Sequence, residues 1–203
     1  MDRRLTREQI QKLCAEFGLS DALVMTVITK ESTRAGFDSD GRPTILFERH
    51  IFFRQLTALK LIKLRDQVVA ERPDLCSSTP GGYGKYSQQH SRLDSATKYH
   101  RECALLSCSW GMMQIMGFNY KAAGFDSVQK FINAMYESEY QQVRAGLNFM
   151  KSANCLDDLK ACKWASFAKK YNGPNYAINH YDTDLAKLYA GIIKNGFKLA
   201  TES

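Results

Sequence analysis

The sequence predicts a mainly α fold of the α+β class, in which a helical domain carries one small β-hairpin or short strand element near residues 38–48. Apolar residues recur at intervals of three and four along most of the chain, as they do on amphipathic helices. One short run, residues 44–48, is β-branched and aromatic instead and follows a turn-forming cluster. The 203 residues, 44% hydrophobic and 24% charged, suit a single domain over residues 1–203 with one hydrophobic core.

The first helix is expected to begin after Thr6 and to end at Gly18. Thr6 and Gln9, three positions apart, form the pattern of a capping box, and glycine commonly follows a helix C-terminus. Its apolar face consists of Ile10, Leu13, Cys14 and Phe17.

The second helix carries Glu31, on which the functional prediction depends. Ser20 is placed to cap its start, and Gly36 is expected to end it in a left-handed conformation. Glu31 extends an apolar stripe on one helix face, whose other members are Val24, Val27 and Ile28. Poor solvation and the negative end of the helix dipole would both raise the pKa of Glu31, as a general acid requires. The alternative is a structural glutamate paired with an arginine or a backbone N–H.

A turn and a short strand follow the second helix. Residues 38–43 resemble a calcium loop only superficially, because Arg42 occupies the third ligand place. The strand over residues 44–48 places Ile45 and Phe47 on one face, and its opposite face carries Thr44, Leu46 and Glu48. The tight reversal is expected to bring the Glu48 carboxylate back toward Glu31.

The rest of the chain is expected to be helical, apart from one long loop. The expected elements are a core helix over residues 50–70 that stops before Pro73, an irregular loop over 75–88, a helix over 91–106, helices from 127 and over 137–151, and a final helix over 182–195. Tyr83 and Tyr86 in the loop either stack on sugar faces or anchor the loop. The final helix either docks on the core or contacts an anionic outer-membrane surface through Lys187, Lys194 and Lys198.

Composition excludes several classes of protein. No apolar run is long enough for a signal peptide or a membrane span, and the sequence contains no HExxH or paired CxxC, so we expect no metal or other cofactor. Six cysteines are expected to be mostly reduced, although Cys155 and Cys162 could pair in an oxidising space. The net charge of +7 indicates an acidic partner, and the absence of a nucleic-acid-binding signature argues against DNA or RNA.

Two further segments have the chemistry of a sugar site. Residues 109–114 combine a flexible glycine with Gln114, whose carboxamide can bond an N-acetyl or hydroxyl group. Residues 171–176 form a rigid turn that presents aromatic rings and amides. Taken singly, each segment would be interpreted as core or as an ordinary turn.

Together the motifs resemble a known superfamily. The order Glu31–Ser32, then residues 109–114, then Tyr171–Asn172 resembles the goose-type lysozymes and soluble lytic transglycosylases. More narrowly, the chain resembles the N-acetylmuramidase family of single-domain phage endolysins. The segments that carry this resemblance are residues 36–37, 43, 46–50, 80–83, 109–111, 114–117, 119–120, 171–174, 179 and 181–182.

The resemblance implies a lysozyme-like fold that cleaves the β-1,4 bond between N-acetylmuramic acid and N-acetylglucosamine in peptidoglycan. It implies that Glu31 is the catalytic acid, and Glu48 is the candidate second carboxylate, acting as base or as stabiliser of oxocarbenium charge. The alternative for Glu48 is a salt bridge with Arg42 or Arg49. The candidate substrate-binding residues are Tyr83, Ser109, Trp110, Gln114, Asn119, Tyr171, Asn172 and Tyr176.

The same resemblance gives expectations about the setting of the reaction. A monomeric endolysin without a signal peptide would collect in the host bacterial cytoplasm and reach the glycan strands of periplasmic peptidoglycan after holin-dependent release. Two alternatives stay open: a lytic transglycosylase that yields 1,6-anhydro products, and a non-catalytic peptidoglycan-binding module.

Overall fold

The fold is mainly helical with one small antiparallel sheet, as the sequence predicts. The computed structural model describes residues 2–32 and 34–199. The helices are α1 (Arg7–Phe17), α2 (Asp21–Glu31), α3 (Arg49–Ala58), α4 (Ile62–Glu71), α5 (Gln89–Leu106), α6 (Val128–Glu137), α7 (Glu139–Ser152), α8 (Leu156–Lys160), α9 (Trp164–Asn172) and α10 (Tyr181–Asn195). The strands are β1 (Ile45–Phe47), β2 (Cys108–Trp110) and β3 (Ile115–Met116).

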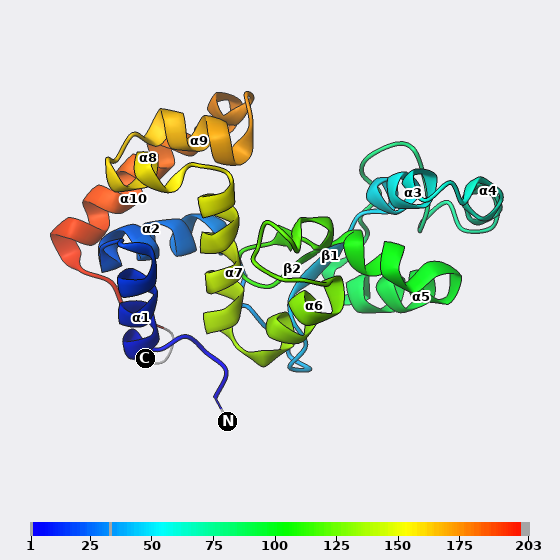
Figure 1. Ribbon diagram of the computed structural model, residues 1–203, viewed down its shortest axis with the longest axis horizontal. Coiled ribbons are helices and arrows are strands. Elements are labelled where there is room, and N and C mark those ends of the chain that lie inside the picture. The colour runs from blue at the N-terminus through cyan, green and yellow to red at the C-terminus, as the bar shows by residue number, and fades with distance from the viewer. Residues whose placement is uncertain (1, 33, 200–203) are drawn as a thin grey trace.

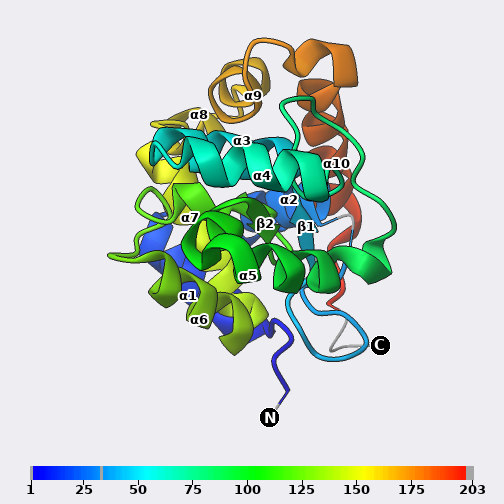
Figure 2. The ribbon, with the colours of Figure 1, turned by 90° about the vertical axis from the view of Figure 1, so that its right-hand side faces the viewer.

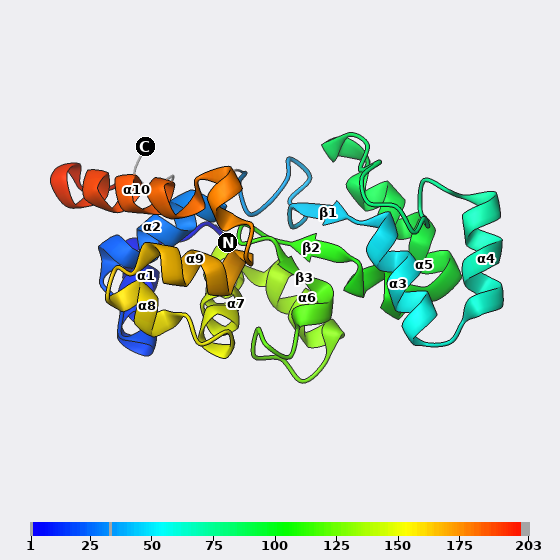
Figure 3. The ribbon, with the colours of Figure 1, turned by 90° about the horizontal axis from the view of Figure 1, so that it is seen from above.

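The helices form two groups on either side of the sheet (Figure 1). Helices α1, α2 and α7 to α10 lie at one end, and α3, α4 and α5 lie at the other, with the sheet and α6 between them. Seen from above, α10 lies along α2 on one side of the molecule, far from the α3–α4 pair on the other (Figure 3). The sheet therefore connects the two groups of helices.

Local capping signals fix the helix starts as predicted. Thr6 and Gln9 form the capping box of α1, and Gly18 ends that helix with φ 62°. The Ser20 hydroxyl accepts a hydrogen bond from Leu23 N, which starts α2. These bonds satisfy backbone N–H groups that have no partner within the helix.

The sheet has the strand order β1-β2-β3, with both pairs antiparallel. Ile45 and Phe47 of β1 are buried, as the alternation predicts, and they pair with Trp110 and Cys108 of β2. Strands β2 and β3 were not expected from the sequence, because each is only two or three residues long.

The expected end of α2 at Gly36 is wrong. The helix ends at Glu31 with Ser32 as its cap, and Gly36 does not take a left-handed conformation. Gly36 is needed for close packing instead, since a Cβ there would lie 2.7 Å from Glu139 Cγ. Glu31 is therefore the last residue of its helix.

The single helix expected over residues 50–70 is also wrong. The chain reverses between α3 and α4, where Lys60 takes φ 58°. Backbone bonds from Lys60 N to Thr57 O (2.9 Å) and from Leu61 N to Leu56 O (3.0 Å) close the turn without a glycine. The two helices pack against each other and cover one end of the molecule (Figure 2).

The final helix docks on the core. Tyr181 and Leu185 of α10 are buried, and α10 packs against α2 and α9. Ile193, near its end, is 63% exposed. Within residues 2–32 and 34–199, no helix has the length and apolar character needed to cross a membrane.

The cysteines are all free thiols. Cys155 Sγ donates to Met150 O at 3.2 Å, whereas Cys162 lies beside the Tyr189 hydroxyl. The two thiols of the proposed pair therefore have different partners in this structure.

Candidate active site

Glu31 lies at the junction of α2 and α10. The Tyr181 hydroxyl, at the start of α10, donates a hydrogen bond to Glu31 Oε1. This contact joins residues that are 150 positions apart in the sequence. It holds the carboxyl group in one place at the end of its helix.

Burial raises the pKa of Glu31 above its ordinary value. The hydrogen bond from Tyr181 and the positive charge of Lys30 both lower this pKa, but burial has the larger effect. A carboxylic acid in this setting keeps its proton at a higher pH than an exposed glutamate does. The group therefore has the electrostatics of a general acid, in the direction the sequence predicts.

Lys30 and Asp184 support the junction from its outer side. Lys30 Nζ lies 2.7 Å from Asp184 Oδ2 and 5.0 Å from the centre of the Tyr181 ring. The ion pair ties α2 to α10 directly next to Glu31.

Tyr171 lies in the same group of aromatic rings. Its ring stacks on Phe167 with centroids 5.5 Å apart and lies 6.3 Å from the Tyr181 ring. Burial and the nearby negative charge of Glu31 raise the pKa of Tyr171. The structure therefore brings the predicted residue Tyr171 close to Glu31, and it adds Tyr181, which was absent from the predicted site.

The other predicted residues near the end of α9 lie further toward solvent. Asn172 is exposed at the last position of α9. Tyr176 is half-buried in the short 3-10 helix Tyr176–Asn179 and packs on the core. Its neighbour Ile178 is 74% exposed.

The turn between β2 and β3 is held by the predicted residues Ser109 and Gln114. Ser109 Oγ donates to Gln114 Oε1 at 2.7 Å, and Gln114 Nε2 donates to Gly111 O at 2.7 Å. Gln114 has φ 46°, a strained backbone conformation for a residue other than glycine. The two side-chain bonds stabilise the turn in this conformation. In this structure the carboxamide therefore shapes the turn.

Trp110 has a core position. Its side chain is 1% exposed, and its Nε1 donates to Leu105 O at 3.1 Å. A sugar cannot stack on a ring that is covered by protein, so the structure removes Trp110 from the set of contact residues. Its neighbour on the turn, Met112, is half-buried.

Two buried polar residues of α7 connect this turn to the chain that follows Glu31. Gln142 Oε1 accepts from Met112 N at 2.8 Å, and Gln142 Nε2 donates to Gly36 O at 3.1 Å. Glu139 accepts from Gly36 N at 3.1 Å. Sequence reasoning missed both residues, although each is a polar residue on the apolar face of a helix, as Glu31 is.

Glu48 and Glu31 adjoin different ends of β1. The Ser32 hydroxyl lies 3.5 Å from Met112 O, so Glu31 adjoins the end of the sheet where Thr44 O accepts from Gly111 N. Glu48 follows the other end of β1, four residues beyond Thr44. The pKa of Glu31 responds to Tyr181 and Lys30, whereas the pKa of Glu48 responds to His50 and Tyr83, so the two carboxyl groups have different partners.

Glu48 has its own partners at that end of the sheet. The Tyr83 hydroxyl bonds its carboxylate, and His50 Nε2 lies 3.7 Å from Oε2. Burial raises the pKa of Glu48 against the opposing effects of His50 and Tyr83. Neither Arg42 nor Arg49 is its partner, so the alternative of a salt bridge is wrong: Arg42 pairs with aspartates, and Arg49 bonds a backbone carbonyl.

The loop that carries Tyr83 packs tightly against α3. Gly82 has φ 65°, and a Cβ there would lie 2.7 Å from Arg49 Cζ. The Tyr83 side chain in this loop bonds Glu48. Asn119 lies in the 3-10 helix Gly117–Asn119, which packs on α5 and α6.

Comparisons with protein families and with solved structures gave matches that cover most of the chain. A family model described as Muramidase, N-acetylmuramidase, matches residues 20–192. The chain is also similar to the crystal structure of Burkholderia AP3 phage endolysin, with 40% sequence identity and a TM-score of 0.85. That alignment covers 95% of this chain and 73% of the other. No match was found among curated proteins.

Proposed function

The chain belongs to the N-acetylmuramidase family, which confirms the resemblance found in its motifs, and we propose that it is an endolysin with Glu31 as its catalytic acid. The proposed reaction is cleavage of the β-1,4 bond between N-acetylmuramic acid and N-acetylglucosamine in peptidoglycan. The observation that carries the proposal is the burial of Glu31 at the end of α2, with its pKa raised and its carboxyl group held by Tyr181.

In the proposed mechanism, Glu31 gives its proton to the glycosidic oxygen as the bond to the sugar breaks. The transition state resembles an oxocarbenium ion, and the anionic Glu31 left behind stabilises this charge. Tyr181 acts as a positioning residue, since its hydroxyl bonds the carboxylate that forms. Tyr171 and the turn at Gln114 would line the sugar site on either side of the acid.

The position of Glu48 affects which nucleophile attacks the sugar after the glycosidic bond breaks. Glu31 is bonded by Tyr181 and acts electrostatically on Tyr171, whereas Glu48 follows the far end of β1 and is bonded by Tyr83. A site with one acid suits either water directed by other groups or attack by the sugar's own 6-hydroxyl group. The second route would yield 1,6-anhydro products, so the geometry favours the lytic transglycosylase as the second candidate function.

Mass spectrometry of digested peptidoglycan separates these reactions. A muramidase produces fragments with a reducing N-acetylmuramic acid end, and this is the expected result. Products with a 1,6-anhydro end would replace the hydrolase by the transglycosylase, and a reducing N-acetylglucosamine end would contradict both. Wall binding without cleavage would indicate a non-catalytic binding module.

The proposed cellular location and binding partners rest on the family and on the net charge. We propose that a single domain acts as a monomer on glycan strands in the periplasm after release from the host cytoplasm. The net charge of +7 would attract the free carboxylates of peptidoglycan, so binding to cell walls should weaken as salt rises. Binding to an anionic outer membrane through α10 remains part of this proposal, because Lys187 and Lys194 on this helix and Lys198 just after it are exposed.

A further inference from the structure

A cavity of about 480 Å³ lies between the chain that follows α2 and the start of α5. Its walls include Arg34, Asp40 and Tyr86, together with the hydroxyl residues Ser39 and Ser87. This volume falls within the range of about 300–1,000 Å³ that is typical of small-ligand sites. None of these residues belongs to the proposed catalytic junction.

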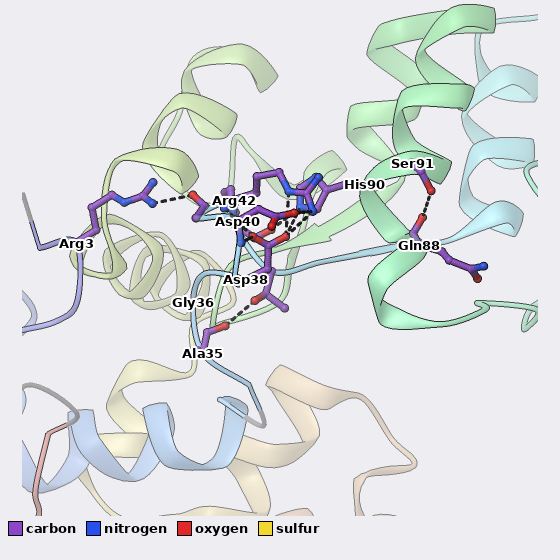
Figure 4. A network of polar contacts seen from close by, with 12 residues as sticks. Arg3, Ala35, Gly36, Asp38, Asp40, Arg42, Gln88, His90 and Ser91 are labelled. Carbon is purple, nitrogen blue, oxygen red and sulfur yellow. Dashed lines mark hydrogen bonds and ion pairs between the residues drawn. The ribbon is translucent and has the colours of Figure 1, made fainter. Parts of the chain in front are cut away.

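One wall of the cavity is held rigid by a polar network (Figure 4). The Asp38 carboxylate accepts hydrogen bonds from Asp40 N at 3.0 Å and from Arg42 N at 2.8 Å. Arg42 pairs with both Asp38 and Asp40, and His90 Nε2 lies 2.9 Å from Pro43 O. These groups pair with one another and form a fixed surface, but two carboxylates face one guanidinium, so the wall keeps one excess negative charge. That charge directs a ligand's carboxylate toward Arg34.

Arg34 differs from the other charged residues of the cavity. Its guanidinium carbon lies 3.4 Å from the centre of the Tyr86 ring, and no carboxylate within residues 2–32 and 34–199 forms an ion pair with it. A guanidinium that stacks on a ring face keeps the N–H donors along its edge free. That edge matches the two oxygens of a carboxylate.

The cavity is close to Glu31. Arg34, Ala35 and Phe37 line both this cavity and a second one of about 420 Å³, which Ser32 also lines. Arg34 is three residues from Glu31, so their Cα atoms are at most about 11 Å apart. An extended peptide of three residues spans a similar length.

From this geometry we infer that the cavity binds the stem peptide of the substrate, with a free peptide carboxylate on the edge of Arg34. The inference rests on the proposed function, because stem peptides are joined to the muramic acid whose bond would be cleaved at Glu31. Ser39 and Ser87 offer hydroxyl groups to the peptide amides. The enzyme would then prefer glycan strands that carry peptides over bare strands.

The test compares kcat/KM on peptide-bearing strands with kcat/KM on strands stripped of peptides by an amidase. Arg34→Ala should lower the ratio of the two values about tenfold or more, the scale of one charge-assisted bidentate pair. Arg34→Lys should restore only part of the ratio, because an ammonium group keeps the charge but not the planar edge. Arg54→Ala is the matched control, because this substitution removes the same charge from an exposed position on α3.

An unchanged ratio in Arg34→Ala overturns the inference, and so does an equal fall in Arg54→Ala, which would indicate a general effect of charge. A direct binding measurement separates this failure from failure of the proposed function. A synthetic stem tetrapeptide with free carboxylates should bind the wild-type protein and bind Arg34→Ala about tenfold more weakly in calorimetry, whether or not glycan is cleaved. Equal affinity for the two proteins would contradict the inference.

Discussion

Replacing Tyr181 by phenylalanine removes one contact of the proposed acid and keeps the aromatic ring in place. The Tyr181 hydroxyl bonds Glu31 Oε1, and this bond favours the ionised carboxylate. Its loss leaves burial less opposed, so the pKa of Glu31 should rise further. Because a general acid must be protonated to act, the pH above which activity is lost should rise with it.

The size of this effect follows from the strength of the bond. A hydrogen bond to a charged group contributes about 1.5–3 kcal/mol. At about 1.36 kcal/mol for each tenfold change, the alkaline limb of the kcat/KM profile should move up by about one to two pH units. The maximal rate should fall at the same time, because the carboxyl group is less firmly positioned.

The assay is the pH dependence of kcat/KM on purified peptidoglycan at constant ionic strength. Tyr189→Phe is the matched control, because Tyr189 lies on the same helix and its ring packs against Trp164, away from Glu31. Its profile should match the wild type. An alkaline limb of Tyr181→Phe that stays in place or moves to lower pH would refute the reasoning about burial and hydrogen bonding.

Three further predictions concern stability and the thiols. Gln142→Leu leaves Met112 N and Gly36 O without their buried partner. The free energy of unfolding should therefore fall by about 3 kcal/mol and the Tm by roughly 6–12 °C, whereas Gln141→Leu should change both only a little. Similar Tm values for the two variants in calorimetry would contradict this. Glu31→Gln should stabilise the fold at pH values above the ordinary pKa of glutamate, because the raised pKa of Glu31 makes its ionisation costly in the folded state. This gain in stability should disappear at lower pH. Tm measurements at pH 4 and pH 7 test the prediction, and a larger gain at pH 4 than at pH 7 would contradict it. Burial raises the pKa of Cys76, Cys103 and Cys155 to about 11 each. Mass spectrometry should therefore find these thiols unlabelled by iodoacetamide until the protein unfolds. Rapid labelling of the native protein would contradict this prediction.

The sequence predicted those parts of the fold that depend on nearby residues. The starts of α1 and α2 follow from Thr6 and Ser20, because a cap needs only the next three residues. The burial of Ile45 and Phe47 follows from the alternation of a strand. Spacing also predicted that Glu31 is shielded from water, although residues 22–28 of α2 are all buried and form no single apolar face.

The rest depends on contacts between distant segments. Lys60 allows the chain to reverse between α3 and α4 although no glycine or proline marks the place, so packing of the two helices decides the break. Gly36 is a site of close approach to Glu139 and not a helix cap. Only the tertiary fold shows such an approach.

The candidate site divides in the same way. Sequence reasoning found Glu31 and Tyr171, which lie together, but it could not find the bond to Tyr181, 150 residues away. The sequence also suggested that Glu48 returns to Glu31. The structure places it at the opposite end of β1, where Tyr83 and His50 surround it.

The most direct test of the account is the rate at which Glu31→Gln lyses purified cell walls, followed by turbidity beside the wild-type protein. Glutamine keeps the size of the side chain and an oxygen that accepts from Tyr181, but it has no proton to give. The account predicts a folded protein that still binds walls and lyses them at least about a hundredfold more slowly. Lysis by this variant at a rate close to that of the wild type would contradict the central claim that Glu31 is the catalytic acid.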